Sequence, residues 1–120
     1  MKYNNFEDLP IWQKARVIVN QIYSIIDSNS KLQKDLRLTG QLIGASVSIM
    51  NNITEGFDAG NNNEFIRFLK YSARSCSEIM SMSYVLNDVY KLKNESEKLY
   101  ADTLEEKKAN KSIHKIFENQ

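Results

Sequence analysis

Proline, glycine and cysteine are scarce in this chain of 120 residues, which holds one proline, four glycines and one cysteine. A β-sandwich or barrel needs many tight turns, so this scarcity favours a few long helices joined by short connections. The single cysteine, Cys76, excludes an internal disulfide and a zinc site built from thiolates, and it suits a reducing cytoplasm. The length is that of one domain with its own hydrophobic core.

Long apolar runs and an excess of charge are also missing. No stretch reaches the roughly 18 apolar residues that would span a bilayer, and the first residues lack the apolar run of a signal peptide. We therefore expect a cytoplasmic protein that does not bind membranes. The formal net charge is +1, so the whole molecule has no strong field with which to attract nucleic acid. Any such binding must come from a local patch.

Apolar residues recur at three- and four-residue spacing, which is typical of amphipathic helices. The pattern predicts helices at about 9–28, 33–55, 62–92 and 96–117, the last interrupted by the polar stretch 105–112. An all-α, antiparallel up-down-up-down four-helix bundle is the simplest arrangement, with residues 1–120 as a single domain. Its predicted core anchors are Trp12, Phe65, Phe68 and Leu69.

A polar corner separates the second and third predicted helices. Glu55 lies at a helix C-terminus, where the macrodipole disfavours an acid, and Gly56 is predicted to end the helix in the left-handed conformation. We expect Glu55 and Asn52 to satisfy the first free amides of the next helix, and a ligand site is the alternative. The predicted structural lock comprises Ser48, Asn52, Glu55, Gly56, Asn62 and Glu64.

Basic residues are concentrated in two places. Arg67, Lys70 and Arg74 recur at i, i+3 and i+7, and such a stripe could hold phosphates. The alternative is an ordinary solvated face, with Glu64 and Glu78 as ion-pair partners. The second group lies near the C-terminus of the last helix, where the dipole favours cations. Its members are Lys107, Lys108, Lys111 and Lys115.

The residues needed for metal or nucleophilic chemistry are absent from the pattern. Di-iron bundles use glutamates and two Glu-x-x-His pairs, whereas the single histidine, His114, has Lys111 three places before it. Cys76 lies among small and apolar residues, which predicts a buried and inert thiol. We expect no enzymatic activity, no catalytic residues, no metal and no cofactor.

Several separated blocks of the sequence occur together in one order. They are Phe6-x-Asp8-Leu9-x-Ile11-Trp12-Gln13-Lys14-Ala15, Gln41 before a small-residue run, Ser48-Ile49-x-x-Asn52-Ile53-x-Glu55-Gly56, Glu64-Phe65-x-Arg67-Phe68-Leu69 and Ala73-x-Ser75-x-x-Glu78. From residue 6 to about 92 the chain resembles the small bacterial four-helix-bundle family encoded by intervening sequences in 23S rRNA genes. It is more distantly similar to the accessory variability determinant of diversity-generating retroelements, a basic bundle pentamer that works with a reverse transcriptase and nucleic acid.

The family resemblance implies a ring-forming protomer, expected to be a homopentamer, with no established enzymatic activity. Family members often carry arginines at two places where this chain does not. Those places read Leu42-Ile43-Gly44-Ala45 and Phe57-Asp58-Ala59-Gly60-Asn61 here. With fewer phosphate contacts, we expect any binding of RNA or DNA to be weak and sensitive to salt. The alternative function is an adaptor that holds a mobile-element protein such as a reverse transcriptase.

Overall fold

The computed structural model describes the backbone of residues 3–118 and the side chains of residues 3–113. Within this part all regular secondary structure is helical and no strand is present, as predicted. In chain order the elements are η1 (Phe6–Asp8), α1 (Pro10–Asp27), α2 (Ser30–Gln33), α3 (Leu36–Asp58), α4 (Asn62–Asp88) and α5 (Lys93–Glu118).

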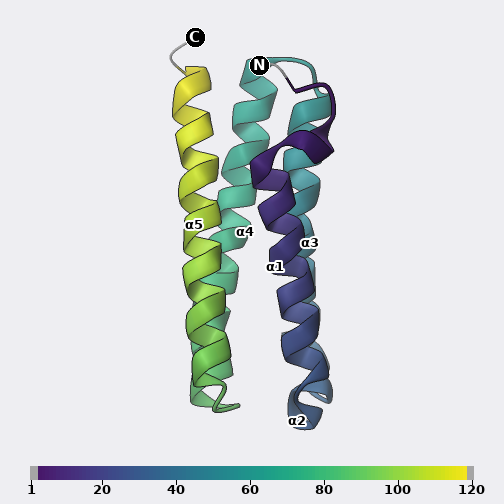
Figure 1. Cartoon of the computed structure of the whole chain (residues 1–120), viewed down its shortest axis with the longest axis vertical. Coiled ribbons are helices and arrows are strands. Elements are labelled where there is room, and N and C mark those ends of the chain that lie inside the picture. Colours follow the sequence, from purple (N-terminus) through teal and green to yellow (C-terminus); the bar gives the residue numbers. More distant parts are fainter. Residues whose placement is uncertain (1–2, 119–120) are drawn as a thin grey trace.

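The four long helices lie side by side in one elongated body of 47 × 20 × 20 Å (Figure 1). Short connections at alternating ends make consecutive long helices run in opposite directions (Figure 1). Helix α1 packs against α3 and α5, and α4 packs against the same two helices from the other side. Thus α3 and α5 occupy opposite corners.

Side-chain caps set three of the helix starts. Asn29, Asp35 and Asn61 accept hydrogen bonds from backbone N–H groups three residues later, at 2.8, 3.1 and 2.9 Å respectively. Each side-chain oxygen satisfies one of the free donors of a helix N-terminus. Asn29 caps the short helix α2, and Asp35 caps α3 as a separate helix. The predicted start at residue 33 was therefore wrong, because α3 begins at Leu36.

The prediction that Gly56 ends its helix was also wrong. Gly56 is buried inside α3, which continues to Asp58. A Cβ atom on Gly56 would lie 2.8 Å from Phe68 Cβ and 2.9 Å from Phe65 Cδ1, so this glycine lets α4 approach α3 closely. The left-handed glycine is Gly60, with φ of 81° in the connection to α4.

The next helix boundary is displaced as well. Helix α4 ends at Asp88 rather than at 92, and α5 begins at Lys93 rather than at 96. Lys91 adopts a positive φ of 58°, a conformation that interrupts a helix. The N–H of Leu92 then bonds to the carbonyl of Leu86 at 3.1 Å.

The core is apolar along α1 and becomes more polar where α5 contributes. Of the predicted anchors, Phe65 and Leu69 are buried, whereas Trp12 and Phe68 are half-buried at the edge of the core. Trp12 packs edge-on against Phe6, with ring centroids 5.3 Å apart. Helix α5 instead directs four polar residues inward, namely Ser96, Thr103, Glu106 and Asn110.

Candidate interaction surfaces

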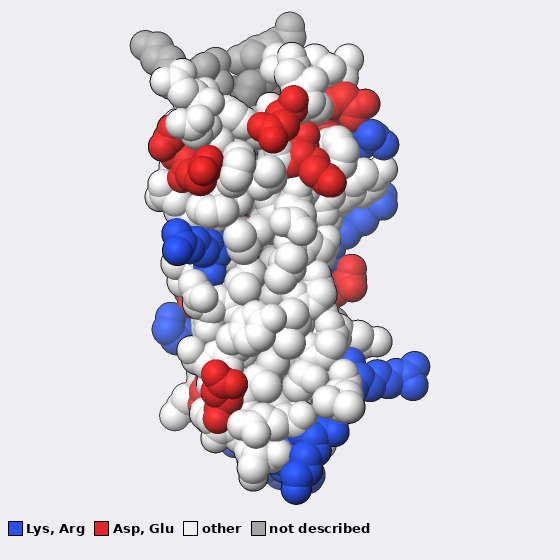
Figure 2. Space-filling view, turned by 90° about the vertical axis from the view of Figure 1, so that its right-hand side faces the viewer, with Lys and Arg blue, Asp and Glu red and all other residues white. Residues whose placement is uncertain are grey.

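The outer side of α3 carries no charged residue between Arg37 and Glu55. We call this strip the α3 face; Gly40, Gln41, Gly44 and Asn51 are exposed in it, and Val47 is half-buried. Figure 2 views the molecule from the side of α1 and α3, and the centre of this view is free of acidic and basic side chains. Charges surround this central area above, below and along both edges of the view (Figure 2). The α3 face is thus a neutral surface on an otherwise charged protein.

Two glycines of the α3 face have no steric explanation within the chain. Nothing lies within 4 Å of a Cβ atom built on Gly40 or on Gly44, in contrast to Gly56. A glycine inside a helix is roughly 0.5–1 kcal/mol less favourable than alanine. The spacing of four residues exposes the helix backbone along one line, where a second helix can approach closely. None of the described helices is both long and apolar enough to traverse a bilayer.

The predicted basic stripe lies on the exposed side of α4. Arg67 forms an ion pair with Glu64, with Nε 2.8 Å from Oε2. The guanidinium groups of Arg67 and Arg74 lie 5.7 and 5.6 Å from the ring centroid of Tyr71. Lys70 is exposed and forms no ion pair with a described residue. Tyr71 was absent from the prediction, although it lies four residues after Arg67 and three before Arg74.

This basic stripe has the chemistry of a modest nucleic-acid contact. Guanidinium and ammonium groups neutralise phosphates, and an aromatic ring beside them can stack on an unpaired base. Glu64 offsets part of the charge of Arg67, which weakens the stripe. In the second basic group, Lys108 and Lys111 are exposed and Lys107 is half-buried. The side chains of Lys115 and His114 lie outside the described residues.

The predicted lock is only partly formed, and by a different partner. Asn52 Nδ2 donates hydrogen bonds to the backbone oxygen and to Oγ of Ser48, at 2.8 and 2.9 Å. The hydroxyl of Ser75 on α4 donates to the same Oγ at 3.0 Å. These three side chains connect α3 to α4. Ser75 was missed because its spacing resembles that of other small residues on α4.

The role predicted for Glu55 was wrong. Glu55 is exposed, and its carboxylate forms no hydrogen bond or ion pair within the described residues. Asn61 caps α4 in its place, and Glu64 pairs with Arg67. Asn62 is exposed in the first turn of α4. The helix continues beyond Glu55 to Asp58, so Glu55 points to solvent instead of toward the next helix.

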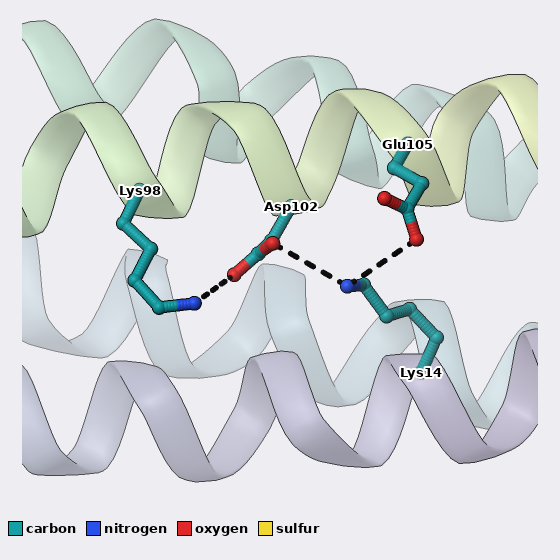
Figure 3. A network of polar contacts seen from close by, with 4 residues as sticks. All are labelled: Lys14, Lys98, Asp102 and Glu105. Atoms are coloured by element: carbon teal, nitrogen blue, oxygen red, sulfur yellow. Dashed lines mark hydrogen bonds and ion pairs between the residues drawn. The ribbon is translucent and has the colours of Figure 1, made fainter.

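A network of charged groups connects α1 to α5 (Figure 3). Lys14 Nζ lies 3.4 Å from Asp102 Oδ1 and 3.4 Å from Glu105 Oε1, and Lys98 Nζ lies 2.9 Å from Asp102 Oδ2. Burial raises the pKa of Asp102, but the hydrogen bond from Lys98 and the charge of Lys14 outweigh it and lower the pKa below the ordinary 3.8. This arrangement holds two helices together and leaves no reactive group free.

Two titratable groups are buried between α4 and α5. Burial raises the pKa of the Cys76 thiol to about 12, with a further contribution from the charge of Glu106. Burial likewise raises the pKa of Glu106 to about 8. Glu106 was missed because it lies in the polar stretch 105–112, although it follows Leu99 and Thr103 along one side of the helix. The part of the chain with described side chains holds no group of three or more His, Cys, Asp or Glu suited to a metal ion.

Residues 7–112 match the family model described as 23S rRNA-intervening sequence protein. No curated protein and no solved structure matches the chain.

Proposed function

Since the chain belongs to the family of 23S rRNA-intervening sequence proteins, we propose that it is a non-enzymatic, up-down-up-down four-helix bundle that assembles with copies of itself. The proposed assembly is a homopentameric ring in the cytoplasm. The α3 face carries this proposal, because Gly40 and Gly44 weaken the helix without relieving any contact in the protomer. Close packing of a neighbouring helix from another copy would explain why glycine occupies these two positions.

The second half of the interface must be a different surface. A ring uses heterologous contacts, in which one patch of each copy meets another patch of the next. The outer side of α4 and its C-cap residue Val89 offer such a patch, since Tyr84, Val85 and Val89 are 61%, 38% and 49% exposed. Tyr84 is held edge-on against Tyr100, with ring centroids 5.9 Å apart. Burying these side chains against the neutral α3 face removes apolar surface from water without burying a charge.

The test compares the mass in solution of matched variants by light scattering. Gly44→Arg introduces a long charged side chain into open space, so the protomer is expected to fold while the assembly dissociates. Ala101→Arg is the control, because Ala101 is a small exposed residue on α5, at the corner opposite α3. If Gly44→Arg retains the mass of the parent, the α3 face is not the interface.

Weak binding of RNA or DNA is the second part of the proposal. Arg67, Lys70 and Arg74 would be repeated around a ring, so that several weak contacts act together on one nucleic acid. Gel-shift titrations with a structured rRNA fragment are expected to show binding that falls steeply with salt. Arg74→Gln should weaken this binding, whereas Lys108→Gln, outside the stripe, should not. An intact assembly that shows no binding at low salt would remove this part of the proposal.

A protein adaptor is the second candidate function. The exposed surface around Tyr84 favours it, because the same side chains can dock a mobile-element protein such as a reverse transcriptase. Tyr84→Ser separates the two candidates. Loss of the assembly assigns this surface to the ring, whereas an unchanged mass leaves it available to another partner. A docking site of this kind should survive high salt, in contrast to nucleic-acid binding.

A further inference from the structure

A cluster of buried polar side chains lies between α4 and α5, which run side by side in opposite directions (Figure 1). Glu106 is level with Cys76, since the charge of the carboxylate acts on the thiol. Asn110 is four residues beyond Glu106 and Ser72 is four residues before Cys76, so the antiparallel helices bring these two to one level as well. We call this set the polar cluster, and it comprises Ser72, Cys76, Thr103, Glu106 and Asn110. Each member is at most 1% exposed.

Most polar atoms of the polar cluster lack a hydrogen-bond partner. Both carboxylate oxygens of Glu106 are unpaired, as are Thr103 Oγ1, Asn110 Oδ1 and Ser72 Oγ. The amide of Asn110 donates to the backbone carbonyl of Glu106 at 2.8 Å, and its effect on the carboxylate lowers the pKa of Glu106 by less than burial raises it. Buried polar groups are paired in the great majority of cases, so this concentration is unusual. An ionised carboxylate in these surroundings would be strongly unfavourable.

The charged groups around Glu106 do not compensate it. On α1, Lys14 favours the ionised form from a distance, but it is already paired with Asp102 and Glu105. On α5, the neighbouring Glu105 disfavours ionisation. On α4, Cys76 presents a neutral thiol, and α3 does not pack against α5. A proton on the carboxyl group is the remaining way to remove the buried charge.

We propose that Glu106 is protonated in the folded protein at neutral pH, and that loss of this proton weakens the packing of α5 against α4. The interface between these helices is thereby a pH-sensitive element of the fold. Burial raises the pKa of Glu106 from the ordinary 4.5 to about 8. The folded state therefore binds more protons than the unfolded state between these two values, and stability falls as the pH rises through this window. Above this window, Glu106 is ionised in both states and no longer contributes to the change of stability with pH.

Urea unfolding of the full chain at several pH values tests the proposal. When the pH rises from about 5.5 to about 7.5, the unfolding constant of the parent should increase roughly a hundredfold relative to that of Glu106→Gln, because the folded parent holds one proton more than the unfolded chain. Glu95→Gln is the matched control, because it removes an exposed carboxylate of α5 that does not act on Glu106, and it should retain the pH dependence of the parent. Equal pH dependence of Glu106→Gln and the parent would overturn the proposal.

A direct titration keeps the proposal testable if Glu106→Gln does not fold. The carboxyl carbon of Glu106 in the parent protein, followed by ¹³C NMR, should titrate with a midpoint near 8. A midpoint close to the ordinary value would contradict a buried proton. A rise in stability at alkaline pH on adding potassium or calcium, seen in the parent and lost in Glu106→Gln, would also overturn it, because the carboxylate would then hold a cation.

Discussion

Gly56 of α3 lies directly against Phe68 of α4, so close that a Cβ atom on the glycine would be 2.8 Å from the Cβ of the phenylalanine. The same added atom would lie 2.9 Å from Phe65 Cδ1. The two helices therefore pack so closely at this point that a side chain at position 56 would not fit. This contact lies next to the α3–α4 connection and fixes how α4 leaves the turn.

Gly56→Ala should consequently destabilise the fold, even though alanine is the better helix former. Overpacking of this kind typically costs about 1–3 kcal/mol, which exceeds the gain in helix propensity. Gly44→Ala, compared with its parent at a dilution that gives the protomer, is the matched control, since nothing within the protomer lies within 4 Å of the added atom and the protomer should be unchanged or slightly more stable. Thermal unfolding followed by circular dichroism measures both. Equal melting curves for Gly56→Ala and the parent would contradict the close contact.

Removal of the carboxylate of Glu55 should have little effect, in contrast to removal of the cap at Asn61. Glu55 is exposed and unpaired within the described residues, so Glu55→Ala should change the free energy of unfolding by less than about 0.5 kcal/mol. Asn61 Oδ1 accepts the N–H of Glu64 at 2.9 Å, and Asn61→Ala should cost about 0.5–2 kcal/mol. Chemical denaturation gives both values. A larger loss for Glu55→Ala than for Asn61→Ala would restore the lock that the sequence predicted.

The outcome at Glu55 and Gly56 shows what the sequence could predict and what it could not. Periodicity predicted the long helices, because the burial of one apolar face determines where they form. It did not predict the break between α2 and α3, where the cap Asp35 outweighs the apolar pattern. A glycine near a helix end can also permit close packing, and recognising that at Gly56 required knowing that Phe68 lies opposite.

The site predictions divide in the same way. Arg67, Lys70 and Arg74 were placed correctly on an exposed side of α4, because their spacing alone fixes one helix face. Ser48 does contact α4, but through Ser75, whose position opposite Ser48 depends on helix packing, and Asn52 bonds to Ser48 within α3. Glu106 was missed because a glutamate in a polar stretch resembles a surface residue until the neighbouring helix covers it.

Loss of Lys14 should weaken the attachment of α1 to α5. Lys14→Met keeps most of the apolar stem and removes the ion pairs to Asp102 and Glu105, so we expect a loss of up to about 1 kcal/mol that diminishes at high salt. Lys93→Met is the control, because Lys93 forms only a 4.0 Å exposed pair with Glu97. Urea unfolding at low and high salt measures the difference. Similar losses for the two variants would argue against a specific role of the network.

The pH dependence of the Asp102 contacts has a defined sign. Because Lys98 and Lys14 together lower the pKa of Asp102 below the ordinary 3.8 despite its burial, the stabilisation is present above that value. It is lost as the pH falls through the lower pKa of the folded state. In Lys14→Met, the pKa of Asp102 measured by NMR should move upward. An unchanged pKa would show that Lys98 alone determines it.

The thiol of Cys76 should be unreactive while the protein is folded. It is fully buried, and burial raises its pKa to about 12, so almost no thiolate is present at neutral pH. The thiol reagent DTNB should label the unfolded chain in urea rapidly and the folded chain only at the rate of opening. Rapid labelling of the folded protein would place the thiol at the surface.

The mass of the unmodified protein in solution tests self-assembly most directly. Native mass spectrometry over a range of protein concentrations is expected to give a discrete assembly of five times the 13.9 kDa chain, which becomes smaller only on dilution. A mass of 13.9 kDa at every concentration would contradict the account, because no helix of a second copy would then pack against the glycines of the α3 face.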